Sequence, residues 1–538
     1  MKVRTNKYII GMLFCGALLT ATSCSDDFLQ KDSLTSVSKN TFWKTAADAK
    51  EGLAACYDAL QNGFLYNDAS NQNKWDGCGP LNMDAMTDNG GRFNWSGWMP
   101  GYDICNGTQS SSSRLIETYW SANYEAIKRC NSLISNVDKV DMDESTKEQY
   151  KAEATVIRAL MYLNLTMTYQ DVPYITSTQS LTDANCEKTD RATIVNNIMQ
   201  DVQNAANILP KETSERGRIT KGAALSLLGR IALYNEKWDA AIKAYEEVTT
   251  LGYSLFPDYT TLFTEDNEAC DEIIWGVRYE GPGKGEGNAI GGHWGSPLEA
   301  INGTIDLADA FYTLDGKPYT KKDDVCNIVD GTPDLWSATG TRYENRDPRL
   351  KTTLFLPGMT WGSADWNYGG SAASFSTIYV MKYFNPALAW STSWDSGQDF
   401  YLIRYSEVLL SLAEAYIESN QNLDKAVSLI DEVRQRAGMP TVENVEGTGL
   451  SQEKLREIVR HERRVELAFE GLRLFDLYRW HTLKDAVDRI NNEASTYKFA
   501  YEYRNYKGNQ EYVWPIPQTE LDSNPMSVSY THLRAHET

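Results

Sequence analysis

Histidine and closely spaced cysteine pairs, the usual ligands of structural and catalytic metal ions, are scarce in this sequence. Its 538 residues include five histidines, and two of these, His532 and His536, lie within the last seven residues. The nine cysteines form no CxxC pair, which argues against a zinc knuckle or a thioredoxin-type site. His461 opens a segment that resembles a zincin helix, but Val465 occupies the place of the second histidine. The sequence therefore predicts no metal and no cofactor, and leaves a structural calcium ion open.

Long apolar runs and an excess of positive charge are missing as well. Beyond residue 24, no segment approaches the run of about 20 apolar residues that a transmembrane helix needs. The formal charge is −21, and loss of the first 23 residues, which carry three basic and no acidic side chains, makes it −24. Such a surface repels nucleic acid and anionic membranes, so nucleic-acid binding is excluded and neutral or cationic partners are favoured.

The N-terminus has the features of an export signal. Basic residues precede an apolar run from Tyr8 to Leu19, which is too short to span a bilayer and is followed by small residues. Cys24 comes after Thr20–Ser23 in a pattern that resembles a relaxed lipobox. We therefore predict a signal peptide at residues 1–23, lipidation of Cys24 and a tether at residues 24–41. An ordinary signal peptide with a coincidental cysteine is the alternative.

The acidic Ser25–Asp27 resembles a tag that sends lipoproteins to the outer face of the outer membrane in some Gram-negative bacteria. Acyl chains on Cys24 would then be the protein's own contact with the membrane. Without the signal and the lipidated residue, seven cysteines remain, an odd number, so at least one is unpaired within the chain. A disulfide between Cys78 and Cys105 is one possibility, which the sequence leaves open.

Apolar residues at helical spacing predict a chain made mainly of helices. Thr45, with Asp48 three residues later, predicts a capped start for a helix that continues through Leu60. The same spacing predicts further helices at 113–137, 144–169, 191–209, 220–234, 238–251, 403–418, 424–437 and 452–470.

Two of these helix pairs resemble tetratricopeptide units. Leu228-Gly229 is followed by Ala241 and Tyr245, a pattern of small and large residues that lets two antiparallel helices approach closely. A weaker copy involves Leu412-Ala413, Tyr416 and Ala426. Ordinary helical hairpins are the alternative for either copy alone, but together they favour an all-α scaffold of tetratricopeptide-type hairpins.

Long insertions separate the helices, at about residues 71–111, 281–297 and 357–399. They are rich in glycine, asparagine, serine and tryptophan. Loops of this length are uncommon unless they are functional or disordered, and disordered segments avoid aromatic residues. We therefore expect these insertions to be ordered and functional.

Several blocks resemble signatures of the SusD/RagB family of surface lipoproteins. They are AEATVIRALMYLNLTMTYQDVPYI (152–175), DAFYTLDGKPY (309–319), RDPRL (346–350), IRYSEVLLSLAEAYIE (403–418) and ERRVELAFEGLRLFDLYRW (462–480). With CSDDFL at the lipidated end and VWPIPQTEL near the C-terminus, they span nearly the whole chain in family order, which predicts one SusD-like domain over residues 24–526. Gln170 departs from the pattern, since the family commonly has glycine there.

The resemblance implies a fold and a function. SusD-like proteins are α-helical, with tetratricopeptide pairs beneath a loop-rich region. They bind glycans at the cell surface and form a lid on a SusC-like TonB-dependent transporter, without cutting the glycan. We therefore expect a glycan ligand, a SusC-like partner and no enzymatic activity.

Sugar binding calls for aromatic faces against the C–H surface and polar groups against the hydroxyls. Trp95 and Trp98 are the first candidates, since family members supply stacking residues from roughly this segment. Further candidates are the tryptophans Trp75, Trp294, Trp336, Trp361 and Trp366 and the polar residues Asp76, Asp84 and Asn94. Loop packing is the alternative for any single tryptophan, and we expect at least two of the seven to stack on sugar.

Two other functions stay open. A surface glycoside hydrolase would need two carboxylates across a sugar cleft, and no local motif singles out such a pair. A peptide-binding relative is the second, since the family fold also serves peptide uptake. Abundant tryptophan favours the glycan without excluding the peptide.

Residues 462–476 have an expected structural role, and residues 527–538 have no assigned role. The many charges of residues 462–476 have helical spacing beside the apolar stripe Val465, Ala468, Phe469, Leu472 and Phe475, which predicts a structural charge network. Residues 527–538 match no family pattern, and we assign them no function and suspect that they are not the natural C-terminus.

Overall fold

The computed structural model is mostly helical and confirms the all-α scaffold. It describes residues 42–67, 79–92, 100–180, 185–290, 301–320, 327–329, 332–334, 342–356, 359, 378–385, 392, 394–497, 504–508 and 512–527. The predicted signal peptide, Cys24 and the tether lie outside the described residues. Of the described helices, none combines the length and the apolar character that crossing a bilayer requires.

The first helix begins where the sequence predicted. In α2 (Ala46–Asp58), Thr45 Oγ1 accepts from the amide of Asp48 (3.2 Å) and Asp48 Oδ2 accepts from the amide of Thr45 (2.7 Å). This reciprocal capping box pairs two amides that a helix start otherwise leaves without partners. A short 3₁₀ turn, η2 (Ala59–Gln61), then ends the helical stretch.

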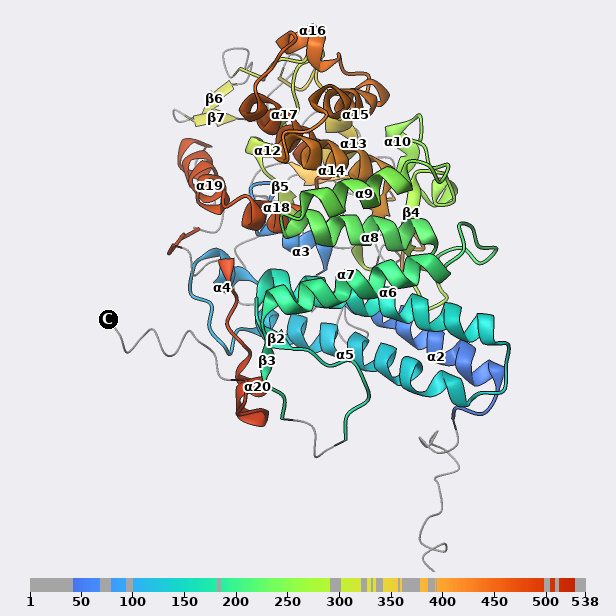
Figure 1. The fold of residues 1–538 in the computed structure, drawn as a ribbon. Helices are drawn as coiled ribbons and strands as arrows, with labels where there is room; N and C mark the ends of the chain where they lie inside the picture. The colour runs from blue at the N-terminus through green and yellow to red at the C-terminus, as the bar shows by residue number, and fades with distance from the viewer. Residues whose placement is uncertain are drawn as a thin grey trace, which may run out of the picture.

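The next helices pack side by side in chain order. They are α5 (Arg114–Asn136), α6 (Glu144–Thr168) and α7 (Arg191–Ile208), each within a few residues of its predicted bounds. A two-stranded ladder of β2 (Val172–Pro173) and β3 (Lys188–Thr189) joins α6 to α7. Figure 1 shows α2, α5, α6 and α7 in the lower part of the molecule, with α8, α9, α14, α15 and α17, all between residues 221 and 466, above them.

The tetratricopeptide interlock is present between α8 (Lys221–Tyr234) and α9 (Trp238–Val248). A Cβ atom added to Gly229 would lie 2.6 Å from the ring of Tyr245, so only glycine allows this helix spacing. The second pair, α14 (Tyr405–Glu418) and α15 (Leu423–Arg436), buries Ala413, Tyr416 and Ala426. The Tyr416 hydroxyl donates to Glu246 of α9, which links the second pair to the first.

Two predicted helices have different bounds. The segment predicted to start at Ile403 opens instead as the end of β10 (Phe400–Arg404), which pairs antiparallel with β4 (Ile273–Val277). The helix predicted over 452–470 ends four residues early, as α17 (Gln452–Glu466). The chain turns there because Phe469 and Gly471 adopt φ angles of 61° and 77°, and it continues as α18 (Arg473–Arg479).

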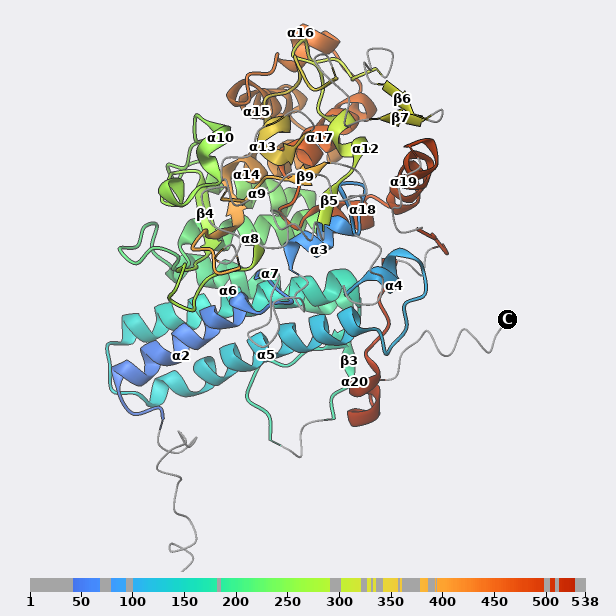
Figure 2. The ribbon, with the colours of Figure 1, turned by 180° about the vertical axis from the view of Figure 1, so that it is seen from behind.

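A small four-stranded sheet lies on the side of the scaffold seen in Figure 2. Its order is β1 (Gly90–Arg92), β5 (Ile301–Gly303), β9 (Tyr379–Val380) and β8 (Leu354–Phe355), with every pairing antiparallel. Short helices surround it: α3 (Pro80–Ala85), α12 (Ile305–Ala310) and α13 (Arg349–Thr353).

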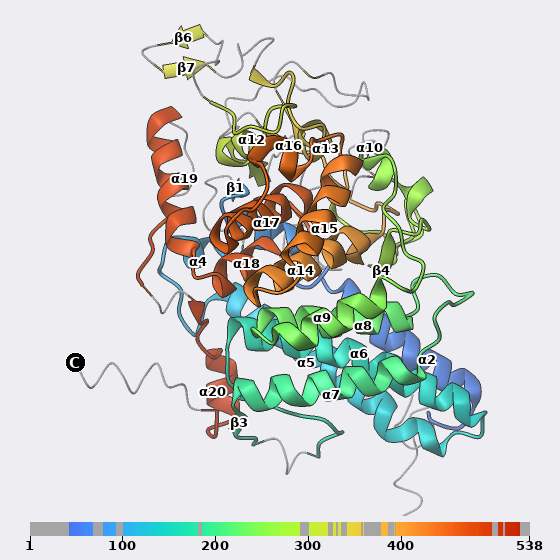
Figure 3. The same cartoon turned by 45° about the horizontal axis from the view of Figure 1, so that its top comes forward.

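Further short elements complete the described chain. The helices are α4 (Tyr102–Cys105), α10 (Tyr259–Leu262), α16 (Val442–Glu446) and α20 (Gln518–Ser523), with 3₁₀ turns η3 (Val137–Lys139) and η5 (Glu265–Asn267). A longer helix, α19 (Leu483–Tyr497), stands at the margin beside the hairpin of β6 (Asn327–Val329) and β7 (Thr332–Asp334), as Figure 3 shows.

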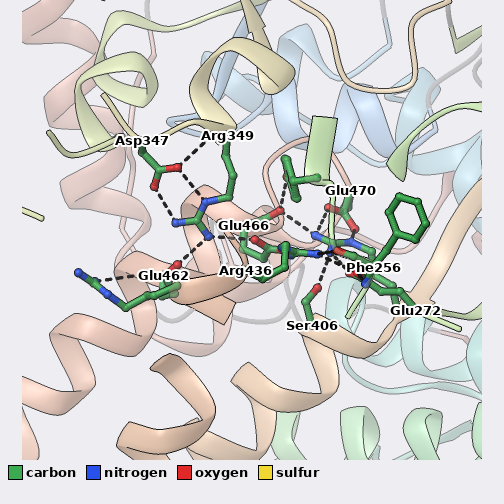
Figure 4. A network of polar contacts seen from close by, with 12 residues as sticks. Phe256, Glu272, Asp347, Arg349, Ser406, Arg436, Glu462, Glu466 and Glu470 are labelled. Atoms are coloured by element: carbon green, nitrogen blue, oxygen red, sulfur yellow. Dashed lines mark hydrogen bonds and ion pairs between the residues drawn. The ribbon is translucent and has the colours of Figure 1, made fainter. Parts of the chain in front are cut away.

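The predicted charge network is confirmed: Arg463 and Asp476 pair within the segment (3.3 Å), and further partners come from distant parts of the chain. Arg404, only 1% exposed, places Nη1 2.7 Å from Glu272 and 2.7 Å from Glu466, and Nε 2.7 Å from Glu470. Arg349 of α13 pairs with Glu466 (2.9 Å) on the other side (Figure 4). The network therefore joins α17, the turn after it, β10, α13 and the residue before β4.

Cations dominate the electrostatics inside this network. Burial by itself would raise the pKa of Glu466, but Arg436, Arg404 and Arg349 outweigh burial and hold that pKa well below its usual value. Lys382 lies beside Glu470 (2.8 Å), and burial lowers the pKa of this lysine to about 8. Buried charges of this kind persist only when every one has a partner.

Candidate functional site

Nine of the ten predicted ligand-binding residues lie outside the described residues. They are Trp75, Asp76, Asn94, Trp95, Trp98, Trp294, Trp336, Trp361 and Trp366. The structure does describe the chain on both sides of each segment that carries them. The described part of the candidate site therefore consists of the residues at which these segments join the scaffold.

Two of the tryptophan segments leave the same end of two neighbouring strands. Residues 93–99, which carry Asn94, Trp95 and Trp98, follow β1 directly, and residues 291–300, which carry Trp294, run directly into β5. In the antiparallel pairing of these strands, Arg92 lies opposite Ile301. The segment of residues 93–99 therefore begins beside the point where the segment of residues 291–300 ends.

A third segment is attached to the other two strands of the same sheet. Trp361 and Trp366 lie between β8 and β9, and Phe355 at the end of β8 pairs with Tyr379 at the start of β9. Because the pairings are antiparallel, this segment leaves the opposite end of the sheet. The strands are only two or three residues long, so roughly 10 Å separate the two ends.

The remaining two tryptophans differ in their attachment. Trp75 lies between Asn67 and Gly79, and the amide of Ala289 donates to the carbonyl (3.3 Å) and side chain (3.1 Å) of Asn67. Its segment therefore begins beside the start of the Trp294 segment. Trp336 follows β7, whose hairpin lies beside α19 at the margin of the molecule (Figure 3). The four-stranded sheet thus holds the segments of five tryptophans, which we call the sheet-anchored tryptophans: Trp95, Trp98, Trp294, Trp361 and Trp366.

Asp84, the one predicted ligand residue that is described, lies in the interior. Its side chain is fully buried, and its two oxygens accept from the Asn89 amide group (2.8 Å) and the backbone amide of Gly471 (2.7 Å). Burial raises the pKa of Asp84 to about 6. The expectation of a ligand contact from Asp84 is not supported, because this placement gives it a structural role between α3 and the turn before α18.

The chain between α3 and β1 is held rigidly, which sequence reasoning missed. Arg504, 1% exposed, donates to the carbonyls of Ala85 (2.8 Å) and Gly90 (2.7 Å). Asp88 accepts two hydrogen bonds of 2.8 Å from Arg473, and the nearby arginines hold its pKa well below the usual range despite burial. The base of the Trp95 and Trp98 segment is therefore anchored by charge-assisted hydrogen bonds.

Two models of known families match this chain, one in each half. A model described as the SusD family matches residues 271–530, and a model described as starch-binding associating with outer membrane matches residues 27–233. The chain belongs to the SusD/RagB family. The predicted resemblance is therefore confirmed.

Individual SusD-like proteins are similar over nearly the whole chain. SusD-like protein P25 from Formosa agariphila is 26% identical over 529 residues, which cover 95% of each chain. The crystal structure of a SusD-like carbohydrate-binding protein from Bacteroides fragilis has a TM-score of 0.77 at 26% identity, covering 91% of this chain and 100% of that one. Surface glycan-binding protein A from Bacteroides thetaiotaomicron, in complex with laminarihexaose, shares the fold with a TM-score of 0.63 at 22% identity, over 90% and 99% of the two chains.

A pair of buried carboxylates lies where the third insertion of this SusD/RagB chain returns to the scaffold. Asp399 and Glu268 are 4% and 6% exposed, and Arg216 lies 3.4 Å from the first and 2.7 Å from the second. The amide of Asp399 donates to Glu268 (2.6 Å), and Asp399 accepts from the amide of Tyr279 (2.9 Å). Burial, and then the charge of Glu268, raise the pKa of Asp399 to about 7. These contacts bind the insertion to β4 and its neighbours.

Asp399→Asn is expected to stabilise the protein at pH 8 and to stabilise it clearly less at pH 5. Between pH 3.8 and 7 the folded chain keeps a proton that the unfolded chain releases, so the free energy of unfolding falls as the pH rises through this window. The shift corresponds to about 4 kcal/mol at most, and we expect a gain of roughly 2 to 4 kcal/mol at pH 8. Denaturant unfolding at both pH values measures this, with the exposed Asp488→Asn as control. Equal effects of Asp399→Asn at the two pH values would contradict the assignment.

Proposed function

We propose that this chain is a lipoprotein of the outer cell surface that binds oligo- or polysaccharide and passes it to a SusC-like TonB-dependent transporter without cutting it. The observation that carries the proposal is the four-stranded sheet, which attaches the segments of five tryptophans to one rigid base. Aromatic rings carried by segments that share one base suit the C–H faces of sugars, and the polar residues of these segments suit the hydroxyls.

The names of similar proteins support a carbohydrate ligand. The Bacteroides fragilis structure is described as a carbohydrate-binding protein, and two structural neighbours are described as binding laminarin or as a complex with laminarihexaose. In this chain we assign sugar contacts to Trp75, Trp95, Trp98, Trp294, Trp336, Trp361 and Trp366, with Asp76 and Asn94 as polar partners. Asp84 is left out because it is buried and its oxygens have partners.

The location follows from the N-terminal sequence. Acyl chains on Cys24 would anchor the protein in the outer membrane, and the name of the second matching family model agrees with an association there. The Cys24→Ala variant is expected to lose incorporated palmitate and to leave the outer-membrane fraction of the producing cells. A variant that remains lipidated and membrane-bound would contradict this part of the proposal.

The experiment on the ligand uses the soluble chain without residues 1–24 on an array of neutral and acidic glycans, with a peptide library beside it. Retention of one glycan class is the expected result. Binding to peptides with no binding to any glycan would instead support the second candidate, a peptide-binding relative.

A further inference from the structure

A pocket of about 270 Å³ lies where α6, α8 and α18 end. None of its lining residues belongs to the four-stranded sheet that holds the tryptophan segments. Aromatic rings form part of its wall, together with amide, carboxylate and guanidinium groups. The lining includes Met167, Gln170, Arg191, Glu236, His481 and Tyr512.

Three of the lining residues have a left-handed backbone just after a helix. Gln170, Glu236 and His481 each come two residues after the last residue of α6, α8 and α18, with φ angles of 67°, 57° and 55°. Glycine, or sometimes asparagine, usually takes this position, because other side chains are strained there. Three other helices of the chain follow that rule: α4 is followed by Gly107, α14 by Asn420 and α15 by Gly438.

The three exceptions that lie two residues after a helix therefore coincide with one pocket, whereas Phe469, three residues after α17, does not line it. Helix termination alone would favour glycine or asparagine at all six positions, and it does not explain why glutamine, glutamate and histidine line the same cavity. Backbone strain that stability does not require often marks a functional site. The side chains of these three residues are the reason we assign a ligand to the pocket.

Two side chains of opposite charge, Arg191 and Glu236, line this pocket without forming an ion pair with a described residue; burial lowers the pKa of Arg191, and the charge of Glu236 partly offsets this lowering. Arg191 makes no ion pair within the described chain; its Nη1 donates to Gln170 (3.0 Å) and its Nε to Asn235 (3.1 Å). Glu236 is exposed and also has no ion pair with a described residue. The other arginine of the lining, Arg479, is neutralised by Glu414 at 2.6 and 2.7 Å. The pocket thus offers hydrogen-bond donors and acceptors together, beside the rings of His481 and Tyr512.

We propose that this pocket binds one neutral, hydroxyl-rich sugar unit and is a second contact point for the glycan. Hydroxyls both donate and accept, which matches the mixed groups of the lining, and the aromatic rings suit the C–H face of a sugar. The inference rests on the proposed function. A second contact on the same chain would slow the release of a long polysaccharide, since rebinding at one site is favoured while the other is occupied.

The test uses the soluble chain without residues 1–24, labelled with ¹³C at the methionine methyl groups. Methyl glycosides of glucose, galactose and mannose are added at millimolar concentration, and the Met167 methyl signal is identified with the Met167→Leu variant. At least one glycoside is expected to shift this signal in a saturable way. Q170G/E236G/H481G is expected to weaken that binding at least 10-fold while its unfolding temperature stays the same or rises, because glycine removes the backbone strain.

Two control variants separate the pocket from other effects. Asn420→Gly changes a left-handed residue away from the pocket and is expected to leave the Met167 shift intact. Alanine at all seven candidate tryptophans is expected to remove glycan binding at the loops but not the Met167 shift, so failure of the proposed function and failure of the pocket can be told apart. The pocket proposal is overturned if no glycoside moves the Met167 signal, if the triple glycine variant binds as well as the original, or if a zwitterionic amino acid shifts the signal and the glycosides do not.

Discussion

Arg404→Met is expected to lower the free energy of unfolding by at least about 3 to 5 kcal/mol, a large share of the roughly 5 to 15 kcal/mol that stabilises a typical domain. Methionine fills most of the space but leaves Glu272, Glu466 and Glu470 without the guanidinium that contacts all three. A buried carboxylate that loses its partner costs more than the pair itself contributed. Denaturant unfolding followed by circular dichroism measures the loss.

The matched control is an ion pair at the surface. Lys484 and Asp488 form a pair on α19 with side chains 60% and 59% exposed, and Lys484→Met is expected to change the free energy of unfolding by less than about 1 kcal/mol. The role assigned to the network is wrong if Arg404→Met and Lys484→Met have similar small effects.

Helices were predictable because their signals are local. Thr45 and Asp48 stand three residues apart, and the capping box that they predict forms as expected. The contact of Gly229 with Tyr245 spans 16 residues, which is still one helical hairpin with a known pattern. In both cases the partners lie within one helix start or one helical hairpin, so spacing alone identifies the contact.

The sheet and the partners of the charge network were not predictable in the same way. Strands of two or three residues, such as β5 and β9, are too short to show alternating polarity, and their pairing depends on residues far apart in the chain. Helical spacing suggested that the charges of residues 462–476 pair within their own segment, whereas Arg349 and Arg404 reach Glu466 from other elements. The burial of Asp84 was equally unpredictable, since nothing near it in the sequence indicates that the backbone amide of Gly471 donates to one of its carboxylate oxygens.

Alanine at all five sheet-anchored tryptophans is expected to reduce glycan affinity at least about 100-fold. Stacking of an aromatic ring contributes about 0.5 to 1.5 kcal/mol beyond burial of its area, so the loss of two or three stacked rings is sufficient for an effect of this size. The sheet that holds these segments is untouched, and the unfolding curve is therefore expected to stay close to that of the original protein. Isothermal titration with the glycan found on the array measures the affinity.

Two single variants make this prediction specific. Trp336 is attached beside β7 rather than to the sheet, and Trp336→Ala is expected to cost less affinity than the five-fold variant. Trp238 lies on α9 of the scaffold, and Trp238→Ala is expected to leave affinity unchanged. Full glycan affinity in a folded five-fold variant would show that the sheet-anchored tryptophans do not form the binding site.

Retention of a carbohydrate without cleavage is the property on which the proposed function depends. The direct test saturates the soluble chain with its array-selected glycan, measures binding by titration, and then analyses the same sample by chromatography after prolonged incubation. We expect saturable binding and complete recovery of the glycan at its original length. Shorter sugars released in proportion to protein and time would contradict this expectation.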